Sequence, residues 1–190
     1  MNTSIGIDSL VERIVHDDDH EAYKQLFKSY YHRLFQFAYS ITKSKESAEE
    51  VVSDVFLKIW LKRKSLEEIR NKHLYLYICT KNQSINYLKR NKRIETFSLD
   101  DCLIEFQSIY FDPHQLLITA EMLKRIQLAI NQLPQKCQLI FKLVKEDGLR
   151  YKEVAELLGL SVKTIENQMA LALRKLEHSI GFDIIRSVSS

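Results

Sequence analysis

The chain has 190 residues and a formal net charge of +3, with 45% hydrophobic residues but only four Gly and two Pro. This length suffices for one medium domain or two small ones with a buried core, and so few turn-forming residues exclude most β-rich folds. No apolar run approaches the about 18 residues of a membrane span, and no basic-then-apolar leader opens the sequence. We therefore expect an all-α cytoplasmic protein without membrane insertion.

The charge is distributed unevenly along the chain. Residues 1–57 carry a net −4 and residues 94–190 a net −2, whereas residues 58–93 hold eleven Lys or Arg against two Asp or Glu, a net +9. Concentrated cations associate with phosphates through counterion release. The middle of the chain is thus a predicted polyanion-binding segment, with a solvated helix face as the alternative.

The first half of the chain has the pattern of three helices. The segment from His20 to Ile41 places an unusually aromatic set of residues at helical spacing, and a second helix is expected to open with a capping box between Ser47 and Glu50. A basic loop over residues 62–72 then leads into a third helix, about residues 73–92. These elements form a predicted domain over residues 1–93.

Residues 94–111 lack a sustained helical period and are interpreted as a linker whose apolar residues dock on another surface. A second domain, residues 112–190, is expected to start with Asp112 as N-cap and Pro113 as first helical residue. Its helices should run to about Leu133 and from Gln135 to Glu146, before a helix-turn-helix.

The stretch Tyr151 to Leu176, YKEVAELLGLSVKTIENQMALALRKL, predicts that helix-turn-helix. Gly159 permits the backbone reversal because it has no Cβ, and Ser161 is a suitable N-cap for the second helix. One face of that helix should be buried and the opposite face should read DNA by phosphate and base-edge contacts. The buried set is Ile165, Met169, Ala172, Leu173 and Leu176. The DNA-binding candidates are Lys163, Thr164, Glu166, Asn167 and Arg174.

With these motifs in place, the chain resembles a sigma factor of RNA polymerase, of the small extracytoplasmic-function (ECF) type that keeps conserved regions 2 and 4 and a linker. The resemblance covers about residues 20–93 and 113–177. The segment SAEEVVSDVFLKIW is similar to the family's helix that binds the clamp of the polymerase β′ subunit. The resemblance implies a polar contact face made of Glu49, Glu50, Ser53 and Asp54, with complementary charge guiding association.

The segment YLYICTKNQSINYLKR resembles the family's promoter −10 helix, in which a basic strip holds single-stranded phosphates and aromatic or amide side chains contact unstacked bases. Asn82 matches a recurrent Asn, Asn86 stands where Asp is common, and Tyr75 replaces the usual Trp. Core packing is the alternative role for Tyr75 and for Tyr77. The implied strand-binding set is Tyr75, Asn82, Asn86, Lys89, Arg90, Lys92 and Arg93.

The C-terminal helix-turn-helix resembles the family's −35-binding region, which inserts its second helix in the major groove. Glu166 stands where many members carry Lys or Arg, so it could accept from cytosine N4. The resemblance implies four partners, namely the core polymerase clamp, its β flap, promoter DNA and an anti-sigma factor.

Two alternatives belong to other classes. The SVKTIENQ…LRKL segment also resembles LuxR-type regulators, which bind duplex DNA without acting as sigma subunits, but residues 1–110 lack the alternating strands of a receiver domain. A recombinase or nuclease would need a catalytic or metal cluster, and Asp17–Asp19 with His16 and His20 is the nearest match. Consecutive aspartates are better explained by the start of a helix, where acids favour the dipole, than by the binding of one metal ion.

The three cysteines lack C-x-x-C spacing and should be reduced thiols. They are Cys79, Cys102 and Cys137. We predict no catalytic residue, metal or cofactor.

Overall fold

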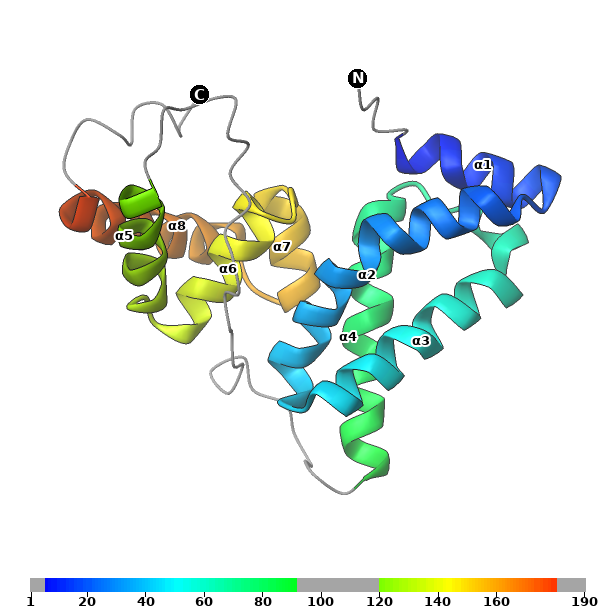
Figure 1. Ribbon diagram of the computed structural model, residues 1–190, viewed down its shortest axis with the longest axis horizontal. Helices are drawn as coiled ribbons and strands as arrows, with labels where there is room; N and C mark the ends of the chain where they lie inside the picture. The colour runs from blue at the N-terminus through cyan, green and yellow to red at the C-terminus, as the bar shows by residue number, and fades with distance from the viewer. Residues whose placement is uncertain (1–5, 92–119, 181–190) are drawn as a thin grey trace. The chain divides into compact units, whose positions relative to one another are not determined.

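The computed structural model of the protein describes residues 6–91 and 120–180, and in these residues every regular element is a helix, as predicted (Figure 1). The chain divides into two compact units, Met1–Phe97 and Ser98–Ser190. The whole predicted linker and the predicted start at Asp112 and Pro113 lie outside the described residues. None of the described helices has the length and apolar character that crossing a bilayer requires.

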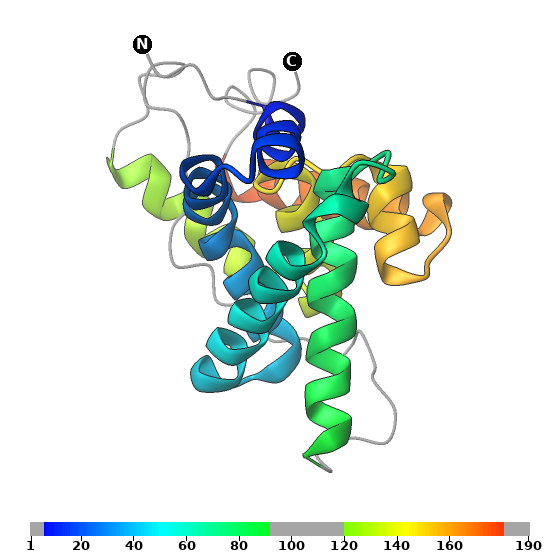
Figure 2. The same ribbon diagram turned by 90° about the vertical axis from the view of Figure 1, so that its right-hand side faces the viewer.

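The N-terminal unit contains α1 (Ile7–Asp17), α2 (His20–Thr42), α3 (Lys45–Leu61), a short 3-10 helix η1 (Arg63–Leu66) and α4 (Lys72–Arg90). Helices α2, α3 and α4 pack on one another, and α1 lies against α2 and η1. Figures 1 and 2 both show α3 alongside α4. Apolar side chains from all three central helices make the core. Its largest fully buried members include Leu26, Leu34, Phe37, Phe56 and Tyr77.

Helix α1 was not expected from the sequence, although its apolar residues recur at helical spacing. Leu10, Val11, Ile14 and Val15 are all buried, so packing of one amphipathic face holds α1 in place. The aspartates that follow separate α1 from α2. Asp18 ends α1 in the left-handed region with φ 49°, and Asp19 caps α2 by accepting from the backbone N–H groups of residues 21 and 22 at 2.8 and 3.0 Å. The prediction that this acidic run belongs to a helix start is confirmed at Asp19.

The predicted capping box at Ser47 and Glu50 is wrong. Helix α3 begins one turn earlier, at Lys45, and Ser44 is its N-cap, with the Ser44 hydroxyl accepting from the backbone N–H of Ser47 at 3.2 Å. Ser47 is buried inside the first turn. Two serines three residues apart both fit the start of a helix. Ser44 is the N-cap because its hydroxyl is the one that accepts a hydrogen bond from a backbone N–H of the first turn.

The C-terminal unit contains α5 (Ala120–Asn131), α6 (Gln135–Lys145), α7 (Tyr151–Leu158) and α8 (Val162–Ile180), with α8 contacting the other three. The helix-turn-helix is confirmed. Gly159 ends α7 at φ 68°, and the Ser161 hydroxyl accepts from the backbone N–H of Thr164 at 3.0 Å. On α8 the predicted apolar face packs inward, with Leu173 half-buried and the other four residues buried.

Candidate functional site

Helix α3 presents a line of exposed residues that mixes acidic, polar and apolar side chains. Glu49, Glu50 and Ser53 are exposed, as expected of a contact surface. The line continues through two leucines that the sequence pattern did not single out, Leu57 at 54% exposure and Leu61 at 68%. Because they lie one turn apart, the two leucines form a small continuous apolar patch that is available to a partner protein.

Asp54, the fourth predicted contact residue on α3, is placed differently from the other three. It is half-buried, and its carboxylate accepts a hydrogen bond from the side-chain amide of Gln83 on α4 at 2.7 Å. The other end of the same amide accepts from the ammonium group of Lys58, one turn further along α3. Asp54 thus takes part in a polar link between α3 and α4.

A cavity of about 210 Å³ opens beside this link and brings three predicted strand-binding residues together. Tyr75, Asn82 and Asn86 from α4 line it together with Lys58 from the last turn of α3 and Lys62, the residue that follows α3. The remaining lining residues are Val55, Ile59, Cys79 and Gln83. Amides, a phenol and ammonium groups around one small hollow offer donors and acceptors to a nucleotide.

Tyr75 and Tyr77 separate clearly in the structure. Tyr77 is fully buried, so it belongs to the core. Tyr75 is half-buried at the cavity, where burial and a side-chain hydrogen bond with Cys79 raise its pKa to about 12. Tyr75 therefore keeps its phenolic proton at neutral pH and offers a ring face and a hydroxyl.

The basic end of α4 is described only in part. Lys89 and Arg90 are exposed in its last turn, where cations also interact favourably with the helix dipole. Lys92 and Arg93 lie outside the described residues.

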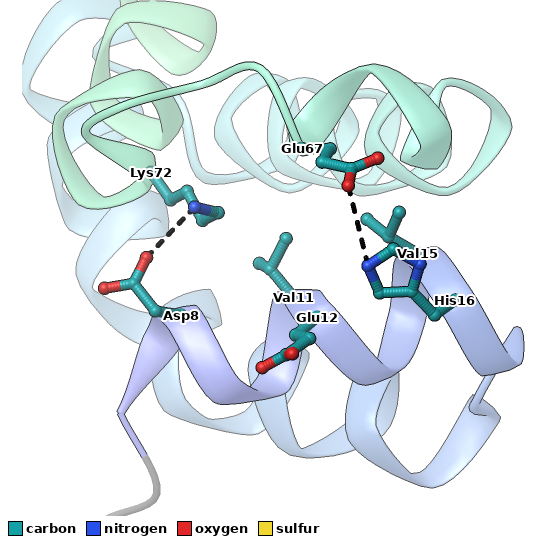
Figure 3. Close-up of a pocket in the computed structure, with 7 residues that line it drawn as sticks. All are labelled: Asp8, Val11, Glu12, Val15, His16, Glu67 and Lys72. Carbon is teal, nitrogen blue, oxygen red and sulfur yellow. Dashed lines mark ion pairs between the residues drawn. The ribbon is translucent and has the colours of Figure 1, made fainter.

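Part of the positive charge in residues 58–93 is paired with α1 (Figure 3). Lys72 meets Asp8 at 3.1 Å. Glu67, an acid of the same segment, lies 3.7 Å from His16 on α1, which adds a contact but pairs no cation of the segment. Arg63 donates to Asp18, and this hydrogen bond holds the pKa of the Asp18 carboxyl below its usual value. Helix α1 therefore fixes the segment between α3 and α4, and the +9 of that region overstates what is open to a polyanion.

On α8 the predicted DNA-reading residues share one outer face. Lys163, Glu166, Asn167 and Arg174 are exposed and Thr164 is half-buried. Lys163 pairs with Glu166 at 3.3 Å, so each offsets the other's charge in the free protein. Arg174 donates to the backbone carbonyl of Ala170 at 3.3 Å. Among the residues that the structure describes, no group of His, Cys, Asp or Glu is arranged to hold a metal ion.

Two family models match the chain, one to each unit. The model for sigma-70 region 2 matches residues 26–94, and the model for sigma-70 region 4 matches residues 123–176. Together they cover most of the chain. The region 2 match lies in the N-terminal half, and nothing in the comparisons supports the LuxR-type alternative.

Curated relatives resemble the chain over most of its length. The ECF RNA polymerase sigma factor SigW of Bacillus subtilis (strain 168) is 23% identical over 160 residues, which are 80% of this chain and 84% of that protein. The ECF RNA polymerase sigma-E factor of Escherichia coli (strain K12) is 24% identical over 182 residues, 90% of this chain and 92% of that protein.

Solved structures share the fold. CnrH, solved in complex with the cytosolic domain of CnrY, has a TM-score of 0.52 at 19% identity, over 91% of this chain and 96% of CnrH. The sigma factor RpoE, solved with the anti-sigma factor NepR from Bartonella quintana, has a TM-score of 0.52 at 21% identity, over 86% of this chain and 99% of RpoE. The chain belongs to the sigma-70 family and is an RNA polymerase sigma factor of the ECF type.

Proposed function

We propose that the two units divide the work of promoter recognition, with residues 94–111 as the linker between them. The N-terminal unit binds the core polymerase clamp through α3 and single-stranded −10 DNA through α4. The C-terminal unit reads the −35 duplex through α8 and contacts the β flap. The observation that carries this proposal is the pairing of α3 and α4. Helix α3 exposes acids and leucines, while α4 exposes amides at the cavity and cations in its last turn.

For core binding, the exposed surface of α3 combines two contributions. Glu49, Glu50 and Ser53 supply negative and polar groups that orient a basic partner and raise the association rate. Leu57 and Leu61 supply apolar area that a partner can bury. The second contribution gives the clamp interface an apolar centre that acidic residues alone do not provide.

For −10 recognition, the cavity between α3 and α4 and the last turn of α4 form one surface on the same helix pair. Asn82 and Asn86 are exposed and offer both donors and acceptors to base edges. Tyr75 contributes a ring at the cavity, and Lys89 and Arg90 neutralise phosphates. We propose that Lys92 and Arg93 extend this strip.

For −35 recognition, α8 enters the major groove with its exposed face. Lys163 and Arg174 contact phosphates near opposite ends of the site, and Asn167 reaches a base edge between them. Thr164 and Glu166 complete the reading set. Because Glu166 pairs with Lys163 in the free protein, docking on DNA requires that Lys163 exchange this partner for a phosphate.

The partners follow from this division of roles. Core RNA polymerase carries out the nucleotide chemistry, so this protein is a recognition subunit without catalytic residues or a cofactor of its own, and it acts in the cytoplasm. We further propose an anti-sigma factor as a partner. RpoE of the compared structures was solved with the anti-sigma factor NepR, and a protein that covers α3 or α4 would block the proposed surfaces.

A pair of leucines with matched exposure tests the core-binding surface. Leu57 on α3 and Leu128 on α5 are each 54% exposed. We expect Leu57→Glu to weaken binding to the isolated β′ clamp at least about tenfold, because it places a charge in the apolar centre of the interface. Leu128→Glu, on the unit that we propose to contact the β flap instead, should have little effect on clamp binding. Equal losses from both variants would contradict the assignment of α3.

A second experiment tests the basic strip in promoter-specific transcription. Replacing Lys89, Arg90, Lys92 and Arg93 together by Ala should weaken promoter opening and flatten its salt dependence, because fewer counterions are released. Core binding should remain nearly intact. Loss of core binding with normal promoter contact would show that this strip belongs to the polymerase interface.

A further inference from the structure

The polar link between α3 and α4 has a fixed direction. Asp54 supplies an acceptor at one end, and the Lys58 ammonium supplies only donors at the other. The Gln83 amide between them must therefore turn its NH₂ toward Asp54, at 2.7 Å, and its oxygen toward Lys58. The reverse orientation would set NH₂ against ammonium and oxygen against carboxylate.

Burial makes this orientation stable. Gln83 is 7% exposed, so the two hydrogen bonds of its side chain form where water competes little. Lys58, by contrast, is exposed and lines the cavity that holds Tyr75, Asn82 and Asn86. A flexible ammonium on a four-carbon stem is thus anchored at the cavity by a buried amide.

We propose that Asp54 and Gln83 are positioning residues for DNA capture. Gln83 holds the Lys58 ammonium at the edge of the cavity, where it binds a phosphate of the single strand, and Asp54 fixes the orientation of the Gln83 amide. This proposal rests on the proposed −10 role of α4. It assigns Asp54 to the strand-binding apparatus rather than to the polymerase contact alone.

The proposal explains why an amide stands between two charged residues one turn apart. Asp54 and Lys58 occupy positions i and i+4 of α3, a spacing at which opposite charges commonly pair directly. A direct pair would hold the ammonium against α3. Bonding through Gln83 draws it toward α4 and the cavity instead, where a fixed cation loses less conformational freedom when it meets a phosphate.

The test measures binding of a short fluorescein-labelled single-stranded DNA of random sequence by fluorescence anisotropy. The full chain is assembled with core polymerase, and binding by core alone is subtracted. Each variant is first checked for core binding and for its thermal unfolding. The variants are Lys58→Met, Gln83→Met, Asp54→Ala, their pairwise combinations and the conservative Lys58→Arg. Lys45→Met, an exposed lysine at the other end of α3, is the matched control.

We expect Lys58→Met to weaken binding about tenfold and to reduce the salt slope by about 0.7, the value for one phosphate contact on a single strand. Gln83→Met and Asp54→Ala should weaken binding about threefold to tenfold. Neither should add to the loss in the Lys58→Met background, because both act through Lys58. Lys58→Arg should retain binding within about threefold, and Lys45→Met should match the wild type.

Additive losses, or wild-type affinity in Gln83→Met, would overturn the positioning role. If Gln83→Met does not fold, the Asp54→Ala and Lys58→Met cycle decides the question in the same way. The double variant Lys89→Ala, Arg90→Ala separates this proposal from the proposed function. If that variant binds the strand normally, the −10 role of α4 fails; if it binds weakly while the Gln83 and Asp54 variants bind normally, only the positioning role fails.

Discussion

Lys142 and Asp147 form a buried ion pair at the turn that precedes the helix-turn-helix. The Lys142 ammonium donates to both carboxylate oxygens of Asp147, at 2.9 and 3.0 Å, and the two side chains are 4% and 1% exposed. The pair joins the end of α6 to the residue before Gly148, where the backbone turns with φ 77°. It therefore ties the support helix to the segment that leads into α7.

Breaking this pair should destabilise the C-terminal unit strongly. Lys142→Met leaves the Asp147 carboxylate buried without its cation, and we expect a loss of about 3–5 kcal/mol in the free energy of unfolding. Circular dichroism during urea unfolding measures the change. Fluorescence of Trp60, the single tryptophan of the chain, reports on the N-terminal unit. That unit should unfold at the same urea concentration as in the wild type. Lys163→Met, which removes the exposed pair with Glu166, should cost less than about 1 kcal/mol.

Substitutions at Gly159 should destabilise the fold through backbone strain alone, without a steric clash. Its φ of 68° lies in the left-handed region, and a Cβ placed there would meet nothing within 4 Å. We expect Gly159→Ala to cost about 1–2 kcal/mol of stability and Gly159→Asn to cost less, since Asn tolerates this conformation. Gly6→Ala, at a negative φ and in equally open space, is the control. Similar losses at both glycines in thermal unfolding would exclude strain at Gly159 as the cause.

Local signals in the sequence predict the long helices and the helix-turn-helix, because spacing and capping depend on residues close together. Tertiary polar contacts are beyond such signals. The bond between Asp54 and Gln83 joins residues 29 apart, and the bond between Arg63 and Asp18 joins residues 45 apart. For this reason Asp54 is expected at the surface but is found half-buried.

Exposure is likewise hard to predict for apolar residues on a helix that is mostly buried. Leu57 and Leu61 continue the i+4 series of Glu49 and Ser53, so helical spacing places them on the outer face of α3, whereas their apolar character alone suggests burial. Helix α1 is a different case, since its apolar residues recur at helical spacing in the sequence although we did not predict a helix there. Ser44 and Ser47 show that a boundary can shift by one turn when two residues fit the same role.

The N-cap of α3 offers a direct test of that corrected boundary. Ser44→Ala removes the hydroxyl that accepts from the Ser47 backbone N–H, and we expect a loss of about 1 kcal/mol in the free energy of unfolding. Trp60 fluorescence is a suitable probe because Trp60 lies on α3 itself. Ser29→Ala, at an exposed position within α2, should stay within about 0.5 kcal/mol of the wild type. A neutral Ser44→Ala would mean that α3 does not depend on this cap.

Acid should release η1 from α1 through Asp18. The hydrogen bond from Arg63 lowers the pKa of Asp18 below its ordinary value of 3.8, so the carboxylate is favoured in the folded protein. The ionised Asp18 carboxylate therefore stabilises the folded protein fully when the pH is above the ordinary pKa. This stabilisation is lost as the pH falls through the lower pKa that Asp18 has in the folded state. The Arg63 guanidinium also lies 4.6 Å from the centre of the Trp60 ring. We therefore expect Trp60 emission to change below about pH 4, before global unfolding is seen by circular dichroism.

Asp18→Asn should show the altered emission already at neutral pH, while Asp17→Asn should titrate like the wild type. If the acid transition persists unchanged in Asp18→Asn, another carboxylate causes it. Asp19 would be the next residue to substitute, because its capping bond to Ala22 and its bond from Arg13 lower its pKa.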